Sequence, residues 1–285
     1  MKKKSIWDFY EMKKAGTKIT WMTAYDYPLA SFAEAAGIDM ILIGDSLGMV
    51  VYGYDGTVSV RMDECIIHCK AVRRGAPNVF IVGDMPFGSY HTSDAYAVAN
   101  AVRFVKEANV DSIKLEGGVR IASRIRAIAD AGIVVIGHIG LTPQSSGVLG
   151  GFKAQGRTAE SAEAVILDAI AVQEAGAKML LVEAIPPELA EAITKILTIP
   201  VLGIGAGADV DGQILICGDM LGYFAAFTPK FVKKYANVAE VIINAIKEYV
   251  DDVQAVRFPA PEHTYSVLSE EKEKFDEMLK KYIKN

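Results

Sequence analysis

Two apolar segments of the chain end in the same pair of residues, a glycine followed by an aspartate. The segments MILIGDS (40–46) and VFIVGDM (79–85) bring Asp45 and Asp84 to the same point of the pattern. Ser46 follows Asp45, and other apolar segments are interrupted or followed by the polar residues Lys114, Glu116, His138, Glu183 and Asp219. Crowded carboxylates repel one another unless a cation or a proton compensates, and their hard oxygens favour Mg²⁺ or a similar ion. The pattern indicates a metal site, although a lone aspartate at a strand end is more often a helix cap or loop residue.

Lys114 and Glu116 are two residues apart in SIKLEGG (112–118). On a strand, this spacing directs both side chains to the same face of the sheet. Burying the two charges is costly unless they are paired or ligated. One interpretation is a plain buried ion pair. The other is functional, with Glu116 helping to hold the metal, directly or through water, and Lys114 neutralising an anionic substrate oxygen.

The elements that must position these residues are short apolar segments that alternate with amphipathic ones. The segments with strand character are 18–25, 40–46, 79–85, 112–118, 134–140, 179–185, 200–207 and 213–222. Most are continuously apolar, which is typical of parallel strands covered on both faces. Helices are predicted over 92–109 behind Thr92 or Ser93, over 157–176 behind Thr158 or Ser161, and over 186–198.

Eight strands with helical connections predict an α/β fold, a (β/α)₈ TIM barrel that forms one catalytic domain over residues 1–285. An open doubly wound sheet is the alternative, but its glycine-rich fingerprint does not follow TWMTAYD (20–26). Residues 7–16 and the last 30 residues are predicted to be appended N-terminal and C-terminal helices that plug the barrel or join subunits. The carboxyl ends of all barrel strands meet at one face, so the polar residues above should converge there.

Composition excludes several classes of protein. A net charge of −5 over 285 residues is too mild for a nucleic-acid surface, and no apolar stretch reaches the roughly 18–20 residues of a membrane span. The charged start MKKKSIWDFY is not followed by the apolar region of a signal peptide. Three cysteines cannot close a disulfide framework. We therefore expect a cytoplasmic protein with no membrane or nucleic-acid partner.

Three features carry weaker signals. Cys65, His68 and Cys69 share one face of a predicted helix, where a buried helix face is favoured over a soft-metal site. GIGAGADVDG (203–212) is either an anion cradle of backbone amides or a set of tight turns. The long glycine-rich segment 141–157 is a candidate lid.

With these residues assembled, the chain resembles the ketopantoate hydroxymethyltransferase family. The motifs that carry the resemblance occur in order between Thr20 and Thr264. They are GDSLGMVVYGYDGT, GDMPFGSY, IKLEGG, GHIGLTPQS, GGFKAQGR, VEAIP and GIGAGADVDGQILICGDMLG. The family is grouped with the phosphoenolpyruvate- and pyruvate-handling barrels, which agrees with the fold predicted above.

The resemblance implies transfer of a one-carbon unit from 5,10-methylenetetrahydrofolate to 3-methyl-2-oxobutanoate, giving 2-dehydropantoate. It implies one Mg²⁺ per subunit, bound through Asp45, Asp84 and Glu116. It also implies that Asp45, Ser46, Asp84 and Lys114 contact the keto acid and that Glu183 accepts a proton. His138 is either a further substrate contact or a core histidine, and Asp219 is interpreted as structural. The glycine before each aspartate is expected to let metal and substrate approach the backbone.

Two other functions remain open from the residues. One is a metal-dependent carbon–carbon lyase that acts on another 2-oxo acid. The other is a non-catalytic barrel that binds a phosphorylated ligand at residues 203–212. Apolar residues in the terminal helices and the family's ring assemblies imply a homo-oligomer, with a decamer as the candidate.

Overall fold

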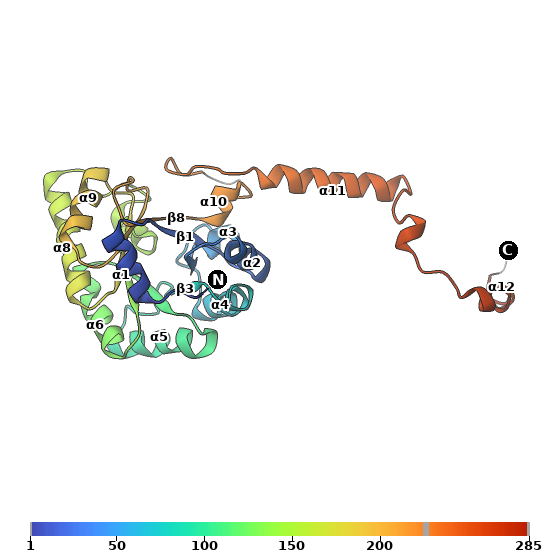
Figure 1. The fold of residues 1–285 in the computed structure, drawn as a ribbon, viewed down its shortest axis with the longest axis horizontal. Coiled ribbons are helices and arrows are strands. Elements are labelled where there is room, and N and C mark those ends of the chain that lie inside the picture. The colour runs from blue at the N-terminus through green and yellow to red at the C-terminus, as the bar shows by residue number, and fades with distance from the viewer. Residues whose placement is uncertain (1, 225–227, 284–285) are drawn as a thin grey trace. The chain divides into compact units, whose positions relative to one another are not determined.

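The computed structural model describes residues 2–224 and 228–283, and the chain divides into two compact units after Ala236. The first unit is the barrel (Figure 1). The second, from Asn237 onward, consists of short and long helices. The interpretation of residues 1–285 as a single catalytic domain stays a prediction.

Eight parallel strands form a closed barrel in which each strand pairs with its neighbours in sequence and β8 pairs with β1. Their bounds are β1 Ile19–Thr23, β2 Met40–Ile43, β3 Phe80–Asp84, β4 Ser112–Glu116, β5 Val135–Gly140, β6 Met179–Glu183, β7 Val201–Ile204 and β8 Gly212–Leu215. The predicted barrel is confirmed. The eighth strand is shorter than expected, because the chain leaves it after Leu215 and forms helix α10, Cys217–Leu221.

Helices cover the outside of the strands, as the ring of α4, α5, α6, α8 and α9 shows (Figure 1). The α-helices of the first unit are α1 Ile6–Ala15, α2 Tyr27–Ala35, α3 Leu47–Val50, α4 Met62–Gly75, α5 Asp94–Ala108, α6 Ala122–Asp130, α7 Ser146–Leu149, α8 Ala159–Glu174, α9 Pro187–Ile196 and α10. Two 3₁₀ turns, η1 Val119–Ile121 and η2 Pro143–Ser145, lie in the loops that follow β4 and β5.

The predicted helix starts follow from capping. The Ser93 side chain accepts a hydrogen bond from the backbone N–H of Tyr96 at the start of α5. Thr158 does the same for Ser161 at the start of α8. Each bond satisfies one of the backbone donors that a helix leaves free at its first turn.

Apolar side chains fill the inside of the barrel and α1 closes its N-terminal end. Phe9 of α1 is fully buried and packs edge-on against Phe80 of β3, with ring centroids 5.2 Å apart. This confirms that the N-terminal helix plugs the barrel. The barrel interior is therefore mostly apolar at one end, and the buried charged residues lie at the other.

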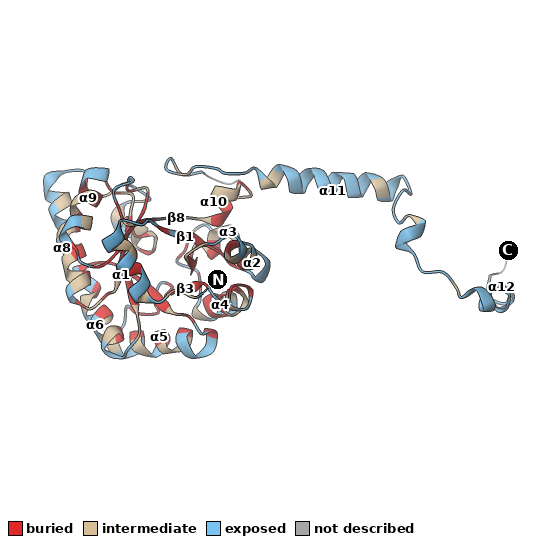
Figure 2. Ribbon diagram, viewed as in Figure 1, coloured by how far each residue is buried: buried red, intermediate tan, exposed pale blue. Residues whose placement is uncertain are grey.

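A second apolar layer lies between the strands and the surrounding helices, as the buried inner sides of the helices show (Figure 2). It explains Gly83, which was expected to give metal or substrate access to the backbone. A Cβ at Gly83 would lie 2.7 Å from Cδ1 of Phe104 in α5. The expectation is wrong for Gly83, because the missing side chain makes room for a helix residue.

The second unit contains α11 Val238–Gln254, the 3₁₀ turns η3 Pro261–His263 and η4 Ser269–Glu271, and α12 Lys272–Leu279. Helix α11 buries none of its residues, although Ile242, Ile246, Tyr249 and Val253 recur at helical spacing. Within the described ranges, no helix has the length and apolar character needed to traverse a bilayer.

Candidate active site

Side-chain alternation on the strands brings the predicted site residues to the inner face of the barrel. Residues two apart on a strand share a face. Asp84 therefore points inward with the interior residues Phe80 and Val82 of β3, and Glu183 with Met179 and Leu181 of β6. The same rule makes Lys114, Glu116 and His138 inward. Strand pairing sets Asp84 beside Lys114 and Glu116 beside His138.

A buried group of charges occupies the carboxyl end of the barrel. Lys114 Nζ lies 2.9 Å from Asp84 Oδ1 and 3.2 Å from Glu116 Oε1. His138 Nδ1 lies 3.3 Å from both Lys114 Nζ and Glu116 Oε1. All four side chains are almost completely buried. The plain ion pair and the functional interpretation of Lys114 and Glu116 both require this contact, so geometry alone leaves both open.

Asp45 joins this group from the loop after β2. Its backbone N–H donates to Asp84 Oδ2 at 3.0 Å, and its own Oδ2 accepts from Gln144 Nε2 at 2.8 Å. The next residue, Ser46, lies with its Oγ 2.7 Å from the Tyr25 hydroxyl. The two Gly-Asp endings therefore meet, as the sequence pattern predicted.

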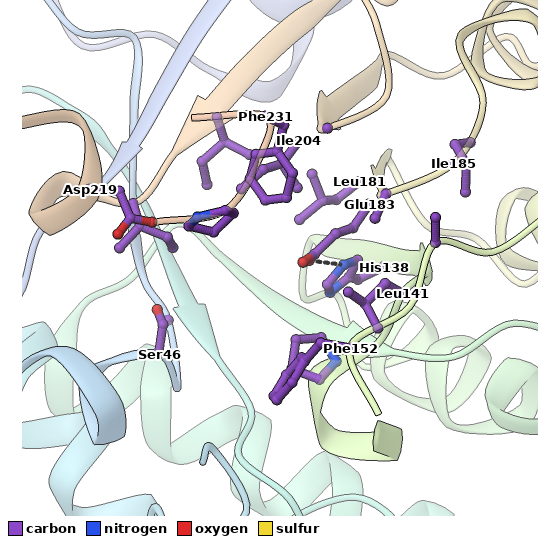
Figure 3. A pocket seen from close by; sticks show the side chains of 18 of the residues that line it. Ser46, His138, Leu141, Phe152, Leu181, Glu183, Ile185, Ile204, Asp219 and Phe231 are labelled. Atoms are coloured by element: carbon purple, nitrogen blue, oxygen red, sulfur yellow. Dashed lines mark ion pairs between the residues drawn. The ribbon is translucent and has the colours of Figure 1, made fainter. Parts of the chain in front are cut away.

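Glu183 and His138 face each other on neighbouring strands. His138 Nε2 lies 3.0 Å from Glu183 Oε2 (Figure 3), but outside the angular range of a hydrogen bond. Glu183 is the more open of the two, with 15% of its side chain exposed. Its carboxylate is therefore accessible from the cavity while the histidine behind it is buried.

Gln144 is a site residue that the sequence analysis missed as a contact. It is buried in the turn η2, where its backbone N–H donates to Glu116 Oε2 at 3.0 Å. Its amide donates to Asp45 and to the carbonyl of Met85, and it accepts from the Tyr90 hydroxyl at 2.6 Å. Gln144 thus fixes two of the predicted metal ligands. Its position in GHIGLTPQS, directly after a strand end, is the signal that was available.

Burial and mutual repulsion disturb the ionisation of the two aspartates. Burial, and then the negative charges of Asp84 and Glu116, raise the pKa of Asp45 well above its usual range. Burial also raises the pKa of Asp84, although Lys114 opposes the shift. Burial opposes ionisation of Glu116 too, but Lys114 and His138 outweigh it and hold its pKa at about 2. One ammonium therefore does not fully compensate three carboxylates.

The donor set fits a hard divalent ion that is only partly ligated by protein. Asp84 Oδ1 is buried and, although close to Lys114, lies outside hydrogen-bond geometry with any described residue. Both oxygens of Glu116 already have partners, which favours contact with a metal through water. Among the described residues no three His, Cys, Asp or Glu side chains form a complete ligand set. Mg²⁺ typically keeps several waters and takes one or two protein carboxylates, so the residues fit it.

All the predicted site residues line one cavity of about 1170 Å³. They are Asp45, Ser46, Asp84, Lys114, Glu116, His138 and Glu183. Asp219, interpreted from sequence as structural, also lines this cavity, on the side opposite His138 and Glu183 (Figure 3). Leu141, Phe152 and Arg157 bring the predicted lid segment to the cavity wall, but its closure stays a prediction.

The structure shows what surrounds two of the three weaker motifs, the helix face with Cys65 and Cys69 and the 203–212 loop. Cys65 and Cys69 are free, fully buried thiols in the core, and His68 bonds to the Tyr25 carbonyl and the Tyr52 hydroxyl. Burial raises the pKa of both thiols, so the favoured interpretation of a buried helix face is confirmed for the cysteines.

In the 203–212 loop, two glycines make room for side chains. A Cβ at Gly205 would lie 2.6 Å from Phe231 Cδ1, and one at Gly207 would lie 2.6 Å from Pro187 Cβ. The glycines thus have a packing role that requires no phosphate.

Comparison with known proteins gives one consistent family. Residues 3–261 match the family model described as ketopantoate hydroxymethyltransferase. The chain is 64% identical over 281 residues to the 3-methyl-2-oxobutanoate hydroxymethyltransferase of Alkaliphilus metalliredigens (strain QYMF), covering 99% of both chains. It is 53% identical over 264 residues to the enzyme of the same name from Geobacillus kaustophilus (strain HTA426), covering 93% of this chain and 95% of that one.

Solved structures of more distant proteins share the fold. Phosphonopyruvate hydrolase, solved with oxalate and Mg²⁺, matches with a TM-score of 0.59 at 14% identity and 98% coverage of both chains. 2,3-Dimethylmalate lyase, a member of the PEP mutase/isocitrate lyase superfamily, matches with a TM-score of 0.56 at 16% identity, covering 96% of this chain and 98% of that one. At these identities the likeness concerns the barrel alone.

Proposed function

Because the chain belongs to the ketopantoate hydroxymethyltransferase family, we propose that it transfers a hydroxymethyl group from 5,10-methylenetetrahydrofolate to 3-methyl-2-oxobutanoate. The product is 2-dehydropantoate, on the route to pantothenate. C3 of the keto acid loses a proton and bonds to the methylene carbon, water supplies the hydroxyl oxygen, and tetrahydrofolate leaves. The observation that carries the proposal is the undercompensated group of buried carboxylates that shares a cavity with Glu183.

Glu183 is the proton acceptor in this proposal. Its Oε2 faces His138 at 3.0 Å, and its Oε1 has no hydrogen-bond partner among the described residues. We assign the C3 proton to Oε1. A positioned general base of this kind contributes roughly 10²- to 10⁴-fold to a rate. His138 lies beside the other oxygen and remains a candidate substrate contact.

Asp45 and Asp84, with Glu116 through water, would hold one Mg²⁺ per subunit. When bound, the ion supplies positive charge that stabilises the enolate of the keto acid. Lys114 Nζ balances the remaining negative charge, and Ser46 Oγ, oriented by Tyr25 at 2.7 Å, donates to the substrate carboxylate.

The rest of the cavity is available to the folate. Binding pockets for drug-sized ligands usually measure about 300–1,000 Å³, and this one is about 1170 Å³. A small keto acid fills only part of it, so both substrates can be bound at once.

The proposal is tested by turnover with each component omitted in turn. Keto acid, methylenetetrahydrofolate and Mg²⁺ together should give 2-dehydropantoate by mass spectrometry, and omission of the folate or chelation of the metal should abolish it. Cleavage of a 2-oxo acid without folate would instead establish a lyase. Heat of binding from phosphate compounds, with none from Mg²⁺ or keto acids, would establish a ligand-binding barrel.

We also propose that the protein is a cytoplasmic homo-oligomer, with a decamer as the candidate assembly. Helix α11 supports self-association, because it carries an apolar stripe that is not buried within the described residues. The three free cysteines agree with a reducing compartment.

A further inference from the structure

Asp219 differs from every other carboxylate that lines the cavity. Asp45, Asp84, Glu116 and Glu183 each contact a protein donor or cation. The Asp219 carboxylate has neither a hydrogen bond nor an ion pair within the described residues, although only 6% of the residue is exposed. Its oxygens are open to the cavity rather than sealed in the core, and partial burial raises the pKa of Asp219. One explanation for such a carboxylate would be a donor in the surrounding chain.

The local structure does not supply that explanation. Asp219 lies in the first turn of α10, but this helix has five residues and its start makes no side-chain cap. Lys234 lowers the pKa of Asp219 at a distance, but it is exposed and forms no ion pair with it. Tyr223, the nearest phenol in sequence, bonds to Cys217 Sγ at 2.9 Å instead. The described residues therefore offer Asp219 no donor, and its carboxylate faces the cavity that it lines.

The walls of the cavity that Asp219 lines suit a flat ring. Phe224, Pro229 and Phe231 line the same cavity. Phe231 packs directly on the backbone of Gly205, which has φ +63° and no side chain to interfere. Phe231 is 37% exposed. Base and pterin rings gain affinity by stacking on such aromatic surfaces, because their faces are apolar and polarisable.

We propose that Asp219 binds the aminopyrimidinone edge of the folate, accepting paired hydrogen bonds from its exocyclic amino group and ring N–H, while Phe231 stacks on the pterin. This inference rests on the proposed function. Figure 3 shows Asp219 across the pocket from His138 and Glu183, with Phe231 between them in this view. The aminopyrimidinone edge lies at the opposite end of the pterin from the nitrogens that carry the one-carbon unit. A ring held at Asp219 therefore directs those nitrogens towards Glu183.

The test compares D219N with the matched variant D209N, in which an exposed carboxylate of the 203–212 loop loses the same charge. The amide of an asparagine would direct an N–H donor at the N–H donors of the pterin, so the paired hydrogen bonds could not form. Loss of a charge-assisted hydrogen bond lowers affinity roughly 10- to 100-fold. In D219N the KM for methylenetetrahydrofolate and the calorimetric Kd for tetrahydrofolate should rise by this factor. Deuterium exchange at C3 of the keto acid, measured without folate, should equal that of wild type, as should every value in D209N.

Unchanged folate affinity in a folded D219N would overturn the inference while leaving the proposed function intact. An equal loss of C3 exchange in D219N would also overturn it, because Asp219 would then act on the keto acid. If wild type itself failed to turn over with the folate, the proposed function would fall first. F231A supplies a second variant, which should weaken tetrahydrofolate binding while C3 exchange persists.

Discussion

Glu183, the proposed base, has a protein group beside only one of its oxygens among the described residues. His138 faces one oxygen of Glu183 and leaves the other directed at the cavity. Burial and Lys114 disfavour protonation of His138, yet Glu116 and Glu183 outweigh them and raise its pKa. His138 thus lies within 3.3 Å of a carboxylate on each side, and in the proposed reaction only Glu183 accepts the proton.

Replacing Glu183 by glutamine should remove the base and keep its shape. We expect C3 deuterium exchange of 3-methyl-2-oxobutanoate to fall about 10²- to 10⁴-fold, because an amide cannot accept the proton. The keto acid and Mg²⁺ should still bind by calorimetry. Glu188→Gln, an exposed change at the start of α9, is the control. Full exchange in the Glu183 variant would remove it from this role.

Gln144 should matter through the ligands that it orients. Gln144→Ala removes the amide donor to Asp45 Oδ2, and loss of such a supporting contact typically costs 10- to 100-fold in metal affinity. Mg²⁺ titration by calorimetry measures this effect. Tyr90→Phe, which removes only the hydroxyl that donates to Gln144, should have a smaller effect in the same direction. Equal Mg²⁺ affinity in all three proteins would contradict the assignment.

At the scale of elements, the packing of β3 against α5 depends on one missing side chain. Gly83→Ala places a methyl group against Phe104, and such overpacking costs about 1–3 kcal/mol of unfolding free energy. Phe104→Leu removes the obstructing ring and leaves a cavity. The double variant should be more stable than the sum of the single effects predicts. Urea unfolding of all four proteins completes the cycle, and strict additivity would show that the two residues are not coupled.

The strands and the direction of their side chains were predictable because both follow from local rules. Continuous apolar segments gave the eight strands, and the alternation of side chains placed Lys114 and Glu116 together. The place of Asp219 at the carboxyl end of the barrel was predicted, but its lack of a partner among the described residues and the contacts of Gln144 were not. Both residues lie in short helical segments, η2 and α10, whose direction depends on tertiary packing. The packing role of Gly83 could not be predicted, because the side chain that requires a glycine there, Phe104, belongs to a different element, α5.

At the scale of the whole molecule, Asp219 should make folding less favourable as pH rises. Its folded pKa lies above the ordinary value of 3.8, so between these two values the folded state binds more protons than the unfolded state. Unfolding free energy therefore falls as pH rises through this window. D219N lacks this loss, so its unfolding free energy should match that of wild type near pH 3.5 and exceed it at pH 7. Urea unfolding at both pH values tests this, with D209N as control. A less stable D219N at pH 7 would contradict it.

Helix α11 should control assembly. Ile246→Glu places a charge in the apolar stripe formed with Ile242, Tyr249 and Val253. We expect sedimentation to show smaller species, because burying an unpaired carboxylate in a contact is unfavourable. Lys247→Glu, which changes charge at a polar position of the same helix, should leave the assembly intact. An unchanged sedimentation coefficient for Ile246→Glu would exclude this helix from the contact.

Phe9 closes the amino end of the barrel, so the interior is open to solvent only at the carboxyl end. Substrates that reach the buried charged group and products that leave it must therefore pass through the same opening of the cavity. If the larger folate binds in that opening, the keto acid has to bind before the folate, and 2-dehydropantoate can leave only after tetrahydrofolate has left. The order of substrate binding and product release would then depend on a single phenylalanine at the opposite end of the barrel from the proposed reaction.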